Sequence, residues 1–127
     1  MIKLEDVTKV YELGQGNTVT AVRGITVEIG SGEFTVIIGR SGSGKTTLLN
    51  LAAGLTRPTS GRVALDGVDL WNLSDQQQSH LRNRKLGFVF QFPSLLPTFT
   101  VLENVFLPTM FRSNGHGPDT ILQSRVP

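Results

Sequence analysis

The stretch VIIGRSGSGKTTLLNLAAG, residues 36–54, places four glycines and one lysine between a β-branched run and a helical pattern. Its central part, from Gly39 to Thr46, fits the spacing G-x-x-x-x-G-K-[ST] of a phosphate-binding loop. Glycines within such a loop allow backbone angles that a Cβ would forbid, so that successive N–H groups can turn inward around an anion. The motif therefore predicts a site for phosphate groups.

Both flanks of the motif agree with this interpretation. The run Phe34–Ile38 is short, apolar and β-branched, which predicts a buried parallel strand before the loop. Leucines and alanines between positions 48 and 52 follow a helical pattern, which Gly54 should end as a C-cap. A glycine-rich connector that happens to contain a lysine is the alternative, and it explains neither the strand nor the helix.

The residues of the loop have separate expected tasks. The backbone of the loop and the N-terminus of the following helix should hold the phosphates, because the first N–H groups of a helix lack internal partners. Lys45 should reach the β- and γ-phosphates, the hydroxyl of Thr46 should ligate Mg²⁺, and Thr47 should contact the α-phosphate. The predicted nucleotide-binding residues of the loop are Gly39, Arg40, Ser41, Gly42, Ser43, Gly44, Lys45, Thr46 and Thr47.

Composition limits the class of protein. With 127 residues, 39% of them hydrophobic and 17% charged, the chain has the size of one globular domain. It contains no cysteine, which excludes disulfides and thiolate metal sites. Twelve basic residues against ten acidic ones are close to balance, so we do not infer binding to nucleic acid. No run approaches the roughly 20 apolar residues of a membrane span and no signal peptide is found, which predicts a cytosolic chain.

The sequence pattern predicts two kinds of structure along the chain. Residues 2–29 alternate with period two around the loop GQGN at 14–17, which predicts antiparallel strands. A hairpin is expected around Asp66-Gly67, between Arg62–Leu65 and Val68–Leu70. From residue 33 onward the order becomes strand, loop and helix. The fold class expected is α/β, a partial phosphate-loop NTPase core with an antiparallel β subdomain.

Further elements are predicted in the second half. Ser74 with Gln77 forms a capping box for a helix that runs to about Arg84. The apolar run Leu86–Phe90 predicts another buried strand. Thr100 with Glu103 caps a further helix, which Pro108 should kink or end.

Three separated features resemble the amino-terminal half of an ABC transporter ATPase subunit of the lipoprotein-release and macrolide-export type. The first is residues 39–67, which are similar to the phosphate loop, helix and hairpin of that family. The second is the segment LGFVFQFPSLLPTFTVLENV at 86–105, which is similar to its Q-loop. The third is Tyr11, ahead of the GQGN loop. The resemblance implies an ATP-binding domain over residues 1–110. Residues 111–127 depart from the family pattern and are expected to be a coil-like tail.

The resemblance implies roles for two further side chains. In the family an aromatic residue at the position of Tyr11 stacks on adenine, although Tyr11 could also be an ordinary half-buried strand residue. Gln91 follows the predicted strand Leu86–Phe90, and the carboxyl ends of strands face the ligand crevice of an open α/β sheet. Its amide could contact Mg²⁺ or water, which makes Gln91 a candidate catalytic and metal-binding residue beside Lys45 and Thr46; a surface glutamine is the alternative.

The resemblance also implies partners. In the family, the region that corresponds to the apolar segment Phe92–Phe99 meets the membrane-spanning transporter subunit. An exposed apolar patch marks a partner surface. The alternative is that these side chains form a small satellite cluster of the core. A second ATP-binding subunit would complete a homodimer. The implied cofactors are ATP and Mg²⁺, and the implied location is the cytoplasmic, inner face of the cell membrane.

Three family motifs do not occur in the 127 residues: the signature sequence, an apolar strand that ends in Asp-Glu, and a switch histidine. Asp66 lies in a predicted turn, and the segment LSDQQ at 73–77 lacks the signature glycines. Two functions stay open: the nucleotide-binding part of a transport ATPase, or a truncated, non-hydrolysing remnant that at most binds nucleotide. Whether the chain is itself an enzyme is left open. A kinase or GTPase would not explain the Gln91 segment.

Overall fold

The computed structural model of the protein describes residues 1–91 and 95–110. Its elements are β1 (Ile2–Gly14), β2 (Asn17–Ile29), α1 (Lys45–Ala52), β3 (Ser60–Leu65), β4 (Val68–Asp69), the 3₁₀ helix η1 (Leu70–Asn72), α2 (Asp75–Lys85) and α3 (Val101–Met110). The chain divides into two compact units, and the boundary between Ser79 and His80 falls inside α2. Each unit is described by itself below.

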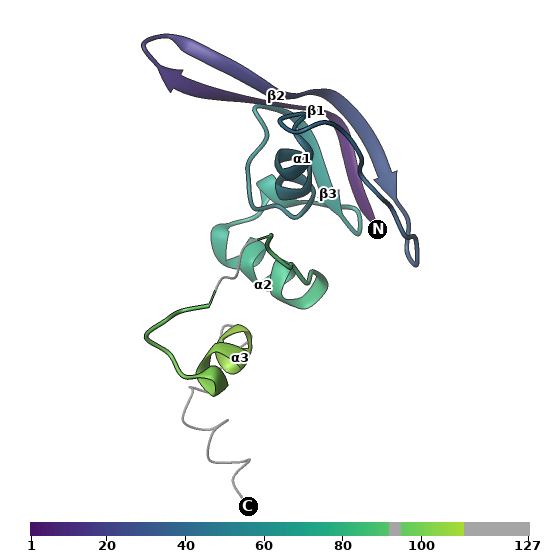
Figure 1. Ribbon diagram of the computed structural model, residues 1–127. Helices are drawn as coiled ribbons and strands as arrows, with labels where there is room; N and C mark the ends of the chain where they lie inside the picture. The colour runs from purple at the N-terminus through teal and green to yellow at the C-terminus, as the bar shows by residue number, and fades with distance from the viewer. Residues whose placement is uncertain (92–94, 111–127) are drawn as a thin grey trace, which may run out of the picture. The chain divides into compact units, whose positions relative to one another are not determined.

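An antiparallel sheet forms the frame of the amino-terminal unit (Figure 1). Its strand order is β2-β1-β3-β4, and every neighbouring pair is antiparallel. The long hairpin of β1 and β2 turns at Gln15-Gly16, within the predicted GQGN loop. The predicted antiparallel subdomain is therefore confirmed.

The β3–β4 hairpin forms where Asp66-Gly67 predicts it. Both turn residues have positive φ angles, +50° at Asp66 and +81° at Gly67, as the two central residues of a type I′ turn require. The register pairs Leu65 with Val68 directly across this turn. Asp66 is thus a turn residue, as its sequence context indicates.

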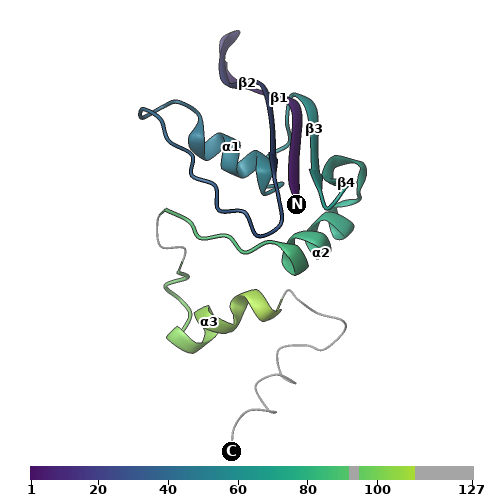
Figure 2. The same cartoon turned by 90° about the vertical axis from the view of Figure 1, so that its right-hand side faces the viewer.

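The core of the amino-terminal unit lies between the sheet and helix α1, which contacts β1 and β2 (Figure 2). The helix ends as expected, because Gly54 has a φ of +64° and donates its N–H to the carbonyl of Leu51 at 3.0 Å. Two residues of β1, the last three residues of β3 and two residues of the helix are among those buried. The buried apolar side chains are Leu4, Val7, Val22, Leu51, Ala52, Val63, Ala64, Leu65 and Leu70.

Both predicted capping boxes are present. The Ser74 N–H donates to the side-chain carbonyl of Gln77 at 3.0 Å, and the Gln77 N–H donates back to the Ser74 hydroxyl at 3.4 Å. The Thr100 N–H donates to the Glu103 carboxylate at 2.7 Å, and the Glu103 N–H donates back to the Thr100 hydroxyl at 3.3 Å. Helix α2 continues to Lys85, one residue beyond the predicted end.

Of the two outcomes predicted at Pro108, a kink or an end of the helix, the end does not occur there, because α3 runs on to Met110; a kink stays a prediction. A proline removes only its own N–H from the helical ladder, so a helix can continue past it when the remaining bonds and the N-terminal cap hold.

Two predicted strands are not formed. Phe34–Ile38 and Leu86–Phe90 have no strand structure, and Phe34, Ile38 and Val89 are 91%, 87% and 95% exposed. Parallel strands exist only through bonds to neighbouring strands, and no parallel pair occurs among residues 1–91 and 95–110. The apolar sequence of these segments is that of buried strands, but nothing within the described part of the chain pairs with them.

Candidate functional site: the phosphate loop

The loop from Gly39 to Gly44 is a compact turn that depends on its glycines. Gly42 and Gly44 have φ angles of +78° and +88°, where a Cβ is strained. A Cβ on Gly39 would stand 2.6 Å from the hydroxyl oxygen of Ser43, and a Cβ on Gly44 would overlap the carbonyl oxygen of Ala21 in β2. Gly39 thus leaves room for the Ser43 side chain, and Gly44 combines a positive φ angle with the close approach of β2.

Helix α1 begins at the end of this loop with free backbone donors. Its N-cap is Gly44, which has no side chain to cap the helix, and the first helical bond runs from the Leu48 N–H to the Gly44 carbonyl at 2.8 Å. Within the described residues, the N–H groups of Lys45, Thr46 and Thr47 meet no acceptor. Three unpaired donors at a helix N-terminus form an anion-binding site.

The ammonium group of Lys45 lies inside the loop. Its Nζ donates to the carbonyl oxygens of Arg40 at 2.7 Å and Gly39 at 2.9 Å, and lies 3.5 Å from the hydroxyl of Ser43. The positive charge is therefore held against the loop that precedes α1. Lysine and amides together supply the donors that a chain of phosphate groups needs.

The remaining residues of the predicted set lie at or near the surface of the protein. Arg40, Ser41 and Thr46 are exposed and Thr47 is half-buried, so the hydroxyl of Thr46 is accessible to a cation bound on the phosphates. A cavity of about 290 Å³ opens beside the loop. Its lining residues are Ala21, Val22, Arg23, Ile25, Ile37, Ile38, Ser43, Gly44, Lys45 and Leu48.

Tyr11 belongs to the same strand pair that the loop touches. It pairs across the hairpin with Val19, which precedes Ala21 by two residues, or about 7 Å along the strand. Its side chain is 37% exposed, and the Lys9 ammonium lies 5.1 Å from the ring centroid. One ring face thus carries a cation–π contact, and a planar ligand would use the opposite face.

Gln91 is exposed and follows a segment without strand structure. It belongs to the carboxyl-terminal unit, whereas Lys45 and Thr46 belong to the amino-terminal unit. The structure groups the loop residues with the strand of Tyr11, and Gln91 stays a prediction.

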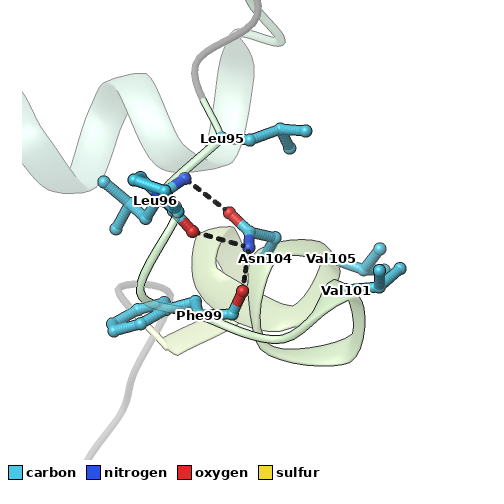
Figure 3. A pocket seen from close by; sticks show the side chains of 7 residues that line it. Leu95, Leu96, Phe99, Val101, Asn104 and Val105 are labelled. Carbon is cyan, nitrogen blue, oxygen red and sulfur yellow. Dashed lines mark hydrogen bonds between the residues drawn. The ribbon is translucent and has the colours of Figure 1, made fainter.

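The apolar region after Gln91 is described from Leu95 onward, while Phe92 and Pro93 lie outside the described residues, as does the predicted tail 111–127. Leu95, Leu96 and Phe99 are exposed. They line a groove of about 280 Å³ in front of α3 (Figure 3). Exposure favours a partner surface over a buried satellite cluster.

One residue of this groove escapes sequence reasoning. The side-chain amide of Asn104 forms hydrogen bonds with both the N–H and the carbonyl of Leu96 in the preceding loop. The available signal is an amide in a helix that is otherwise apolar between Val101 and Leu107 apart from the capping Glu103.

None of the helices in the described ranges combines the length and the apolar character that a membrane crossing requires.

Comparison with known proteins places these features in one family. Residues 22–125 match the family model of the ABC transporter. The chain is 45% identical over 115 residues to the macrolide export ATP-binding/permease protein MacB of Syntrophobacter fumaroxidans, which covers 91% of the chain and 16% of that protein. It is 48% identical over 118 residues to the lipoprotein-releasing system ATP-binding protein LolD of Anaeromyxobacter dehalogenans, with 93% and 49% covered. The chain spans about half or less of the length of these relatives.

Two solved structures that match the chain are also ABC cassettes. The dimeric, post-hydrolysis ATP-binding cassette MJ0796 bound to ADP and Pi matches with a TM-score of 0.85 and 40% identity, over 98% of this chain and 53% of that one. A second dimeric structure of MJ0796, a bacterial ABC transporter cassette, matches with a TM-score of 0.86 and 41% identity. The chain thus has part of the α/β phosphate-loop fold of these cassettes, with its antiparallel subdomain. Since the family match includes the loop, α1 and the β3–β4 hairpin, the chain belongs to the ABC transporter family.

Proposed function

We propose that the chain binds ATP with Mg²⁺ through the phosphate loop and serves as nucleotide-binding part of an ABC transporter. The observation that carries this proposal is the combination, within one loop and the helix that follows it, of the Lys45 ammonium bound to loop carbonyls and three free amides at the start of α1. The related cassette MJ0796 was solved with ADP and Pi, which supports a nucleotide as the ligand.

Each loop residue has a role in this proposal. Lys45 exchanges its two carbonyl partners for the β- and γ-phosphate oxygens, where charge-assisted bonds are stronger. Thr46 ligates Mg²⁺ with its exposed hydroxyl, and Thr47 contacts the α-phosphate. Tyr11 stacks on adenine with the ring face opposite Lys9, and Gln91 contributes to the metal and to the attacking water once the whole cassette is assembled.

The partners proposed are those of a transporter cassette. A membrane-spanning subunit contacts the apolar region Phe92–Phe99, whose described part, Leu95–Phe99, is exposed. A second ATP-binding subunit is supported by the dimeric structures of MJ0796. Such an assembly lies on the cytoplasmic, inner face of the cell membrane, and ATP hydrolysis then powers export or lipoprotein release. The names of the relatives MacB and LolD support these two transport classes.

A second candidate is a nucleotide-binding protein that does not hydrolyse ATP. It is favoured by the lack, within the 127 residues, of an apolar run that ends in Asp-Glu. In phosphoryl transfer, acidic residues position Mg²⁺ and the nucleophile, so a chain with the phosphate cradle alone should bind and not turn over. The purified 127-residue chain should therefore release no phosphate at steady state, and turnover that Lys45→Ala abolishes would contradict this candidate.

Equilibrium titration with a fluorescent ATP analogue and Mg²⁺ tests nucleotide binding. Lys45→Ala should weaken binding at least about tenfold, because hydrogen bonds to charged groups contribute about 1.5–3 kcal/mol each. Lys85→Ala, which removes an exposed lysine from the end of α2, is the matched control and should leave the affinity unchanged. Equal affinity of the parent protein and Lys45→Ala would refute the proposal.

A further inference from the structure

Asn104 connects a loop to a helix through its side-chain amide (Figure 3). The N–H of Leu96 donates to Asn104 Oδ1 at 2.8 Å, and Asn104 Nδ2 donates back to the Leu96 carbonyl at 3.1 Å. The same Nδ2 reaches the carbonyls of Phe99 at 3.1 Å and Thr100 at 2.9 Å. One side chain in α3 therefore serves four backbone groups of the preceding loop.

Only an amide can make this set of bonds. A side-chain amide offers two N–H hydrogens and one carbonyl oxygen, so it can pair with the N–H and the C=O of Leu96 while the three carbonyls around Nδ2 share its two hydrogens. An aspartate at this position would keep the acceptor and lose the donors, and its second oxygen would face carbonyl oxygens. A leucine of similar size would lose every bond.

The bonds of Asn104 shape the apolar groove of about 280 Å³. Leu96 and Phe99 form its loop side, and Val101 and Val105 form its helix side, with Asn104 at the junction (Figure 3). Apart from this amide, the residues that line the groove are apolar: Leu95, Leu96, Pro97, Phe99, Val101 and Val105. Apolar side chains that face each other across water tend to close, because closure removes their surface from water. A fixed backbone opposes this closure.

We propose that Asn104 is a positioning residue that holds the loop at Leu96–Phe99 in place and keeps the groove open before a partner binds. A loop that is already ordered loses less conformational entropy on binding, which raises affinity without an added contact. The use of the groove rests on the partner surface proposed above, whereas the positioning role rests on the hydrogen bonds alone.

Hydrogen exchange at the Leu96 amide tests the role, measured on the full chain by mass spectrometry with single-residue resolution. Asn104→Leu at pH 7 should speed exchange of this amide about fivefold to tenfold, the effect of losing one net hydrogen bond. Gln76→Leu, at an exposed position of α2, is the control and should leave Leu96 unchanged. Unaltered protection of Leu96 in Asn104→Leu would overturn the proposal.

The variant Asn104→Asp tests whether Asn104 acts through its hydrogen bonds or only through the volume of its side chain. Aspartate suits the first turn of a helix, where the dipole favours negative charge, so α3 itself should not be weakened. At pH 7 the carboxylate can still accept from the Leu96 N–H but is repelled by the Leu96, Phe99 and Thr100 carbonyls, so the loop should be held less tightly and the Leu96 amide should exchange faster than in the parent. Protonation restores one donor, so the ratio of exchange rates to the parent should return toward one as the pH falls toward 4.

The background for this pH series should be Glu103→Gln, which retains a capping box and removes the one titratable side chain between Leu95 and Met110. A pH-independent ratio in Asn104→Asp would show that Asn104 only fills space and would overturn the positioning role. Nucleotide titration of the parent protein reports separately on the phosphate loop. Loss of ATP binding there would remove the proposed function and leave the Leu96 result intact.

Discussion

The carbonyl oxygen of Ala21 occupies the space that a Cβ on Gly44 would need. Gly44 therefore has two reasons to be glycine, its φ of +88° and the backbone of β2 beside it. This contact joins the antiparallel sheet to the phosphate loop directly. The strand that carries Ala21 also pairs Val19 with Tyr11, so the phosphate cradle and the proposed adenine contact share one support.

Replacing Gly44 with alanine should destabilise the amino-terminal unit more than the same change at Gly42. Both positions have positive φ angles, which costs a non-glycine residue about 1–2 kcal/mol. A Cβ at Gly42 meets no atom within 4 Å, whereas one at Gly44 overlaps Ala21. The free energy of unfolding, followed by fluorescence of the single tryptophan, Trp71, measures the difference. Equal losses in the two variants would show that the contact with β2 is unimportant.

Removing the ring of Tyr11 should weaken ATP binding and leave inorganic triphosphate binding unchanged. Stacking of a base on an aromatic ring contributes about 1–3 kcal/mol, so Tyr11→Ala should raise the Kd for ATP about fivefold to 150-fold. Tyr11→Phe keeps the ring and is the matched control. If Tyr11→Ala binds ATP as tightly as Tyr11→Phe, adenine does not stack there.

The capping box of α3 should open in acid. The backbone N–H of Thr100, and then its hydroxyl, hold the pKa of the Glu103 carboxyl below its ordinary value of 4.5. A carboxyl group whose pKa is lowered by folding stabilises the fold above its unfolded pKa, and this contribution is lost as the pH falls through the folded value. Exchange of the Thr100 amide, relative to its intrinsic rate, should therefore accelerate below pH 4.5.

Glu103→Gln retains the cap without a titrating group, so its Thr100 protection should not change over the same range. The same acid-induced loss in both proteins would assign the effect to another group.

The purified chain should associate with itself through the exposed apolar segments Phe34–Ile38 and Leu86–Phe90. Extended segments of this kind offer unpaired backbone groups and apolar side chains to other chains. A charge at one highly exposed position of each segment, Ile38→Lys with Val89→Lys, should shift size-exclusion profiles toward the monomer. Val101→Lys, also exposed but in α3, is the control. A monodisperse parent monomer with strongly protected amides at 36–38 and 88–90 would contradict this expectation.

Sequence reasoning succeeded where the chemistry is local. The turn at Asp66-Gly67 and the two capping boxes depend on residues at most three positions apart, and the phosphate loop carries its own spacing. The two apolar segments failed as strands because a strand depends on partners elsewhere. Asn104 was missed because its partners lie up to eight residues away, and an amide in a helix does not reveal which backbone groups it reaches.

The bonds of Lys45 to its own loop turn ligand binding into an exchange. A phosphate must displace the carbonyls of Gly39 and Arg40 from the ammonium group. A charged oxygen can outcompete these neutral dipoles, whereas the hydroxyl of an unphosphorylated nucleoside cannot. The proposed function therefore predicts that adenosine binds far more weakly than ATP, because only a ligand with its own negative charge releases the lysine.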